Sequence, residues 1–154
     1  MDLEHLAGRA LGTVVFPVER GKLRELARAL HDEDPVWWDE DAARAAGFDG
    51  VPAPPTATVL AAHWTPGALI GRPLELGLDV ARLLHGEAAW SELRPIRAGD
   101  VLKADAEVEG VTRREGRRGG TMTLLVICTR FANQRGEQVA VLRDTWVQTA
   151  AVAP

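Results

Sequence analysis

The sequence predicts an α+β fold in which an antiparallel sheet wraps around a central apolar helix. Two observations predict it: a short β-branched segment and three helical segments come first, and four long strand-like segments follow. A chain with this order packs most simply with the sheet curled around its most apolar helix. The 154 residues suit one domain, 1–154, whose core needs neither a disulfide nor a metal.

The first strand and the first helix are predicted from the N-terminal quarter of the chain. Residues 13–18 form a β-branched run, which favours a strand. Over residues 19–30, apolar side chains recur every three or four positions, which predicts an amphipathic helix. Residues 31–38 are then predicted to be a loop, because the residue before Pro35 is displaced from the α region.

Two further helices are predicted before the sheet. Asp39 is suited to cap a short helix over residues 40–46, and Gly47 suits its left-handed C-terminal position. The prolines of residues 51–55 lead directly into a helix over residues 56–64, because proline is tolerated in the first helical turn. This helix is strongly apolar, so we expect it to be the buried centre of the fold. Its expected core residues are Val59, Leu60 and Ala62.

The second half of the chain changes to strand-like patterns. Residues 66–73 form a connection punctuated by glycine and proline. Four strands separated by turn signals are then predicted over residues 83–93, 101–111, 121–133 and 138–149. Four long strands in succession make an antiparallel sheet.

Composition and charge exclude several function classes. A net charge of −4 with mixed signs gives no field for recruiting nucleic acid. No apolar run approaches the roughly 18 residues of a spanning helix, and residues 1–10 lack a secretory signal, so we expect a cytoplasmic protein without a membrane partner. The single Cys128 has no second thiol and is expected to be buried and inert. The four histidines lack metal-ligand spacing, so no metal is expected.

Several short motifs resemble those of MaoC-type hydratases and dehydratases. Residues 31–37, His-Asp-Glu-Asp-Pro-Val-Trp, resemble the Gly-Asp-x-Asn-Pro-Leu-His signature of (R)-specific enoyl-thioester hydratases, and residues 94–100 resemble a turn between two strands of these proteins. More narrowly, residues 48–56 together with residues 84–87 resemble the FAS1-like, N-terminal MaoC dehydratase group, which includes accessory subunits of mycobacterial (3R)-hydroxyacyl-carrier-protein dehydratases. The resemblance implies a hot-dog fold, a dimer, and acyl-CoA or acyl-carrier-protein thioesters as ligands, with no other cofactor.

The resemblance also implies which catalytic parts this chain has lost. Hydrating an enoyl thioester requires a base for water, an acid for the α-carbon and a donor to the enolate oxygen. Asp32 occupies the family's aspartate position, but Trp37 replaces the histidine and does not exchange protons. Pro54 and Pro55 fall where the family has the glycine amide that serves as oxyanion donor, and proline has no N–H. The amide and hydroxyl of Thr56 are available at the same helix end.

Other candidate site residues have two interpretations each. Asp32 is either the base or a loop carboxylate that bonds local amides. Trp37 and Trp38 are either packing residues or the mouth of an acyl tunnel. His85 and Glu87 lie two apart on a predicted strand and so share a face, where they would be available for acid–base chemistry.

Arg117 and Arg118 belong to an arginine-rich, glycine-flanked turn between two predicted strands. They are either a solvated hairpin or ligands for a phosphate of CoA or of a carrier protein, for which the guanidinium geometry is suited.

Three functions remain open. The first is a catalytically degenerate accessory subunit, which holds the acyl thioester in a heterodimer with a catalytic MaoC-type partner; Trp37 and Pro55 favour it. The second is a self-sufficient homodimeric hydratase or dehydratase that uses Asp32 with His85 or Glu87. The third is a non-catalytic thioester-binding module or a hot-dog thioesterase. A dimer is expected in each case, because one hot dog exposes a sheet edge.

Overall fold

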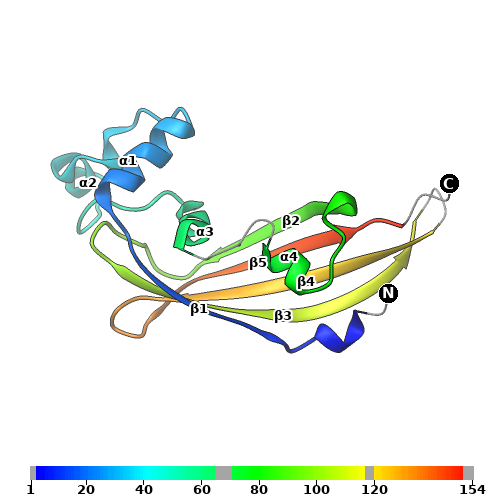
Figure 1. The fold of residues 1–154 in the computed structure, drawn as a ribbon. Helices are drawn as coiled ribbons and strands as arrows, with labels where there is room; N and C mark the ends of the chain where they lie inside the picture. Colours follow the sequence, from blue (N-terminus) through cyan, green and yellow to red (C-terminus); the bar gives the residue numbers. More distant parts are fainter. Residues whose placement is uncertain (1–2, 65–70, 117–119, 151–154) are drawn as a thin grey trace.

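The computed structural model describes residues 3–64, 71–116 and 120–150, and it confirms the α+β class (Figure 1). A five-stranded antiparallel sheet in the order β1-β3-β4-β5-β2 forms its framework. The strands are β1 (Ala10–Pro17), β2 (Leu83–Glu92), β3 (Val101–Glu115), β4 (Thr121–Ala132) and β5 (Gln138–Gln148). All five predicted strands are confirmed.

Two strands extend beyond their predicted bounds. β1 begins earlier than predicted because Ala10 pairs with Glu107 of β3. β3 continues to Glu115 because its polar end pairs with the start of β4, where Glu115 lies opposite Thr121. In both cases ladder hydrogen bonds continue past the end of the β-branched or apolar pattern.

Short helical segments lie at one end of the sheet and over its middle (Figure 1). The α-helices in the described part of the chain are α1 (Arg20–Ala29), α2 (Glu40–Ala45), α3 (Ala61–Trp64) and α4 (Gly71–Glu75), and the 3₁₀ turns are η1 (Glu4–Leu6), η2 (Pro35–Trp37), η3 (Ala57–Leu60) and η4 (Val80–Arg82). The predicted caps of α2 are confirmed: Asp39 accepts the Ala42 N–H at 2.8 Å, and Gly47 has a φ of +90°. α1 confirms the first predicted helix.

The predicted central helix over residues 56–64 is wrong in form. The segment is the 3₁₀ turn η3 followed by the single turn α3, and its first bonds run from Ala57 N–H to the Pro54 carbonyl and from Val59 N–H to the Thr56 carbonyl. These i→i+3 bonds wind the chain more tightly than an α-helix and turn different side chains outward. Val59 and Ala62 are therefore exposed, contrary to the prediction. Leu60 is half-buried against the core.

Two loop predictions are also corrected. Within the predicted loop over residues 31–38, η2 forms because the Asp34 side chain accepts the Val36 N–H at 3.0 Å and caps it. α4 overlaps the end of the connection predicted over residues 66–73, where Pro73 lies inside the helix. Residues 65–70 lie outside the described residues.

The core consists of two clusters at opposite ends of the same face of the sheet. One joins β1 and α1 to the middle strands, and its largest buried side chains include Phe16, Leu23, Leu102 and Phe131. The other joins η1 and the segment after α4 to the far ends of β3 and β4. Between the clusters, the face forms the wall of a cavity.

Cys128 is buried on β4, as expected. Burial raises the pKa of its thiol, which keeps the sulfur protonated and unreactive at neutral pH. Within the described ranges, no helix combines the length and hydrophobicity that a membrane span requires.

Candidate functional site

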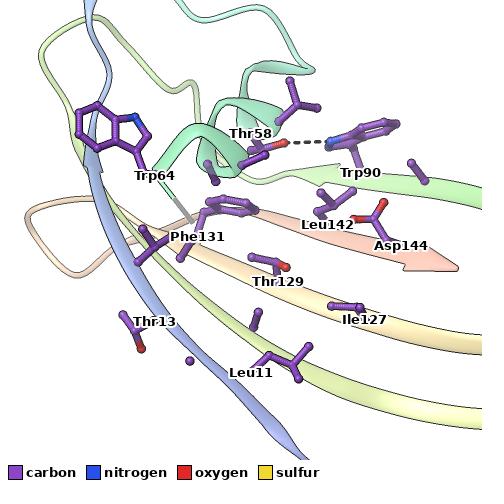
Figure 2. Close-up of a pocket in the computed structure, with 18 of the residues that line it drawn as sticks. Leu11, Thr13, Thr58, Trp64, Trp90, Ile127, Thr129, Phe131, Leu142 and Asp144 are labelled. Carbon is purple, nitrogen blue, oxygen red and sulfur yellow. Dashed lines mark hydrogen bonds between the residues drawn. The ribbon is translucent and has the colours of Figure 1, made fainter. Parts of the chain in front are cut away.

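An apolar cavity of about 440 Å³ lies against one face of the sheet (Figure 2). All five strands contribute side chains or backbone to its wall, and η3 and α3 form its other side. Its larger apolar lining residues include Leu11, Trp64, Trp90, Ile127, Phe131, Leu142 and Trp146. This volume and lining, with a few polar groups, are typical of a site for an apolar small molecule.

A partly buried hydrogen bond joins η3 to the edge strand β2. Trp90 Nε1 on β2 donates to Thr58 Oγ1 at 2.9 Å, and Thr58 is only 2% exposed (Figure 2). Both residues line the cavity, so the bond sets the distance between two of its walls. The sequence analysis did not single out either residue, because a threonine in an apolar turn and a tryptophan on a strand carry no signal that they pair.

Two titratable side chains, His85 and Asp144, line the cavity. His85 Nε2 lies 3.1 Å from Asp144 Oδ1, and the two side chains are 58% and 25% exposed. Asp144 comes from β5, a strand paired on both sides. Asp144 was not predicted from the sequence. It could have been found, because alternate residues of a strand share a face, and Asp144 lies between the apolar Leu142 and Trp146 on the face that lines the cavity.

A β-bulge at Gly86 separates the two candidates of β2. The register with β5 shifts between His85 and Glu87, so their partners on β5 are adjacent instead of two residues apart. As a result His85, Ala88 and Trp90 line the cavity, whereas Glu87 does not. The prediction that His85 and Glu87 share a face is wrong, because a bulge interrupts the alternation on which it relied.

Asp32 lies in the loop after α1 and is not part of the cavity lining. Its Oδ1 accepts the Asp34 N–H at 3.0 Å, directly after His31, which adopts a left-handed φ of 56°. This is the local hydrogen bond of the loop-carboxylate interpretation. The structure does not bring Asp32 into the cavity that His85 lines.

Trp37 and Trp38 also lie away from the cavity lining, beside α1 and α2. The guanidinium carbon of Arg24 stands 6.0 Å from the Trp38 ring centroid, a cation–π contact on α1. Their positions support the packing interpretation. The tryptophans that line the cavity are Trp64, Trp90 and Trp146.

Pro55 and Thr56 precede η3. Pro55 is exposed, and Thr56 occupies the N-cap position without a side-chain cap bond. Among the described residues, no hydrogen-bond partner reaches the buried Thr56 Oγ1. An unsatisfied buried hydroxyl costs about 1–3 kcal/mol. Arg117 and Arg118 lie outside the described residues.

Comparison with known proteins identifies the family. The family model of the FAS1-like, dehydratase domain region matches residues 5–142. A UPF0336 protein of Saccharopolyspora erythraea is 36% identical over 135 residues, which cover 88% of this chain and 83% of the relative.

Solved structures show the same architecture. A MaoC-like dehydratase matches with a TM-score of 0.77 and 32% identity, over 97% of this chain and 44% of the other. The C-terminally truncated HadBC (3R-hydroxyacyl-ACP dehydratase) complex of Mycobacterium tuberculosis matches with a TM-score of 0.71 and 26% identity, over 92% and 96% of the two chains. This chain therefore belongs to the FAS1-like dehydratase domain family and has the hot-dog fold of the MaoC-like dehydratase superfamily.

Proposed function

We propose that this protein is the substrate-holding subunit of an (R)-specific enoyl-thioester hydratase or 3-hydroxyacyl-thioester dehydratase. It binds the acyl chain of a CoA or carrier-protein thioester, and a MaoC-type partner supplies the intact Asp/His pair. The observation that carries this proposal is an apolar cavity whose lining does not include Asp32. The chain also has Trp37 at the family's histidine position.

The cavity supports the acyl part of the proposal. Its lining is mostly apolar, and each methylene that enters leaves water with a gain of about 0.8 kcal/mol. Affinity should therefore rise roughly tenfold for every two methylenes until the cavity is full, since 1.4 kcal/mol corresponds to a factor of ten.

The sheet edge supports the partner. β2 is an edge strand of ten residues, and every residue in it is exposed or half-buried. The apolar Leu84 and, just beyond the strand, Leu93 are among its exposed side chains. A long edge with exposed apolar residues is a template for pairing with another chain. The HadBC relative is itself a complex of a 3R-hydroxyacyl-ACP dehydratase.

Purification from the native host followed by mass analysis tests the partner directly. We expect a stoichiometric MaoC-type subunit. The reconstituted complex should hydrate trans-2-octenoyl-CoA at least about 100-fold faster than this chain alone, because general acid–base catalysis contributes roughly 10² to 10⁴. A homodimer that hydrates the same thioester at the rate of the complex would overturn the proposal.

A further inference from the structure

Asp144, whose side chain is 25% exposed, places a carboxylate on a mostly apolar face of the sheet. Its direct cross-strand neighbours are Ile127 on β4 and Ala88 on β2, both of which line the cavity with it. A carboxylate withdrawn from water costs free energy unless it is paired, and a well-packed apolar residue often serves stability as well as a buried ion pair does. Its recorded side-chain partner is His85 Nε2 at 3.1 Å. The charge at this position therefore calls for an explanation other than stability.

The β-bulge directs His85 toward Asp144. If side chains alternated strictly along β2 from Trp90, residue 86 would face the cavity and residue 85 would face away from it. Because of the bulge, His85 lines the cavity and Gly86 does not. Gly86 is required there, because a Cβ would lie 2.9 Å from Val147 Cγ2 and 3.2 Å from a backbone oxygen of β5. The backbone of β2 is thus shaped to bring an imidazole into the cavity.

The contact between the two side chains fixes where the proton of His85 lies. An ionised carboxylate only accepts hydrogen bonds, so with Asp144 ionised it is Nε2 that carries the proton and donates a hydrogen bond to Asp144 Oδ1. In the neutral ring, Nδ1 then keeps its lone pair and is free to take a proton. A histidine oriented in this way by an aspartate is an effective general base.

We propose that His85 and Asp144 form a proton-transfer pair of the cavity. This pair is separate from the signature loop, residues 31–37, where the family carries its Asp/His pair and this chain has Asp32 and Trp37. His85 is the catalytic group, and Asp144 is the positioning residue that fixes its tautomer. The inference rests on the proposed function, since its substrate is the enoyl thioester held in the cavity. Among the described lining residues, these two are the titratable ones, and the Thr58 hydroxyl already accepts a bond from Trp90.

The hydration step balances with these groups alone. The oxygen of a water molecule bonds to C3 of the trans-2-enoyl thioester while His85 Nδ1 takes one water proton. The C2–C3 π pair moves to C2 and the thioester carbonyl as an enolate. The imidazolium then returns its proton to C2, which yields the 3-hydroxyacyl thioester and neutral His85. The chain alone should therefore show a slow hydration rate of its own.

Single-turnover hydration of trans-2-octenoyl-CoA by the purified chain tests the pair, with the Kd measured in parallel by calorimetry. His85→Ala and Asp144→Asn should each lower the rate at least tenfold while the Kd changes less than threefold. Added imidazole should restore part of the rate in the His85→Ala variant and none in Asp144→Asn, a difference that a merely structural role would not produce. Ser91→Ala, on the same strand but outside the cavity lining, is the matched control and should leave the rate unchanged.

The outcomes separate the two proposals. If the chain binds the thioester but shows no hydration, or if the rate survives both substitutions, the proton-transfer pair is wrong and the substrate-holding function stands. If the thioester binds neither to the chain alone nor to its complex with the partner, the proposed function itself is wrong.

Discussion

The signature loop after α1 and the cavity wall formed by β2 and β5 both carry carboxylates, but in different chemical settings. In the loop, Asp32 and Asp34 accept the backbone N–H groups of Asp34 and Val36 at 3.0 Å. In the wall, Asp144 faces a titratable side chain, His85, among apolar neighbours. The loop carboxylates therefore bond to backbone amides, whereas the wall carboxylate contacts an imidazole.

This difference separates two kinds of information in the sequence. The loop motif resembles a family signature, and its hydrogen bonds shape the chain between α1 and α2. The cavity lies away from this loop, and its lining residues bear on which ligand it binds. The motif therefore bears on the fold of the chain, and the proposed site of its chemistry is the cavity.

The largest expected effect comes from filling the cavity. Ala106 lines it and lies on β3 opposite Thr129. Ala106→Phe should lower octanoyl-CoA affinity about 100-fold, because displacing about four methylenes forfeits roughly 3 kcal/mol. Calorimetric titration measures the loss, and a retained cooperative melt shows that the variant folds.

Glu33→Ala in the signature loop is the control for this change, because Glu33 is exposed and outside the cavity lining. Its Kd should equal that of the unmodified protein. If the loop substitution weakened binding as strongly as Ala106→Phe, the acyl chain would lie against the loop and the comparison would fail.

A smaller effect is expected from the bond that joins two cavity walls. Trp90→Phe keeps an aromatic side chain but leaves Thr58 Oγ1 buried without its donor, which should cost about 1–3 kcal/mol of unfolding free energy. Adding Thr58→Val should recover part of this loss, since the hydroxyl that needs a partner is then gone. Urea denaturation of the single and double variants measures the coupling. Strictly additive losses would show that the bond does not join the walls.

The smallest expected effects are on the unfolding free energy when the loop carboxylate Asp34 or the wall carboxylate Asp144 is replaced. Asp34→Ala should lower the unfolding free energy by about 1 kcal/mol, because η2 loses its cap. Asp144→Leu should leave it unchanged or raise it by about 1 kcal/mol, since an apolar residue replaces a paired charge on an apolar face. Thermal and urea melts distinguish the two. A clear loss of stability in Asp144→Leu would mean that the wall carboxylate is structural after all.

Local patterns predicted most of the fold. The five strands follow from runs of strand-forming residues, and α2 follows from Asp39 and Gly47, because each signal lies within a few residues of the structure it predicts. The family resemblance of residues 31–37 was equally local. These features needed no knowledge of how distant segments pack.

The cavity required information that local patterns do not carry. The His85–Asp144 contact joins residues 59 positions apart, and it depends on the register between β2 and β5. The bulge at Gly86 inverted the expected facing of Glu87, because one inserted residue shifts the whole alternation. The predicted central helix failed for a similar reason, since the tight winding of η3 changed which side chains face outward.

Photo-crosslinking shows where the acyl chain lies in the protein. A diazirine placed on the acyl chain of octanoyl-CoA reacts with the residues that surround the bound chain, and peptide mapping identifies them. We expect labels in β2 and β5, around Trp90 and Leu142, that saturating unlabelled octanoyl-CoA suppresses. Suppressible labels confined to residues 31–38, with none on the cavity wall, would contradict it.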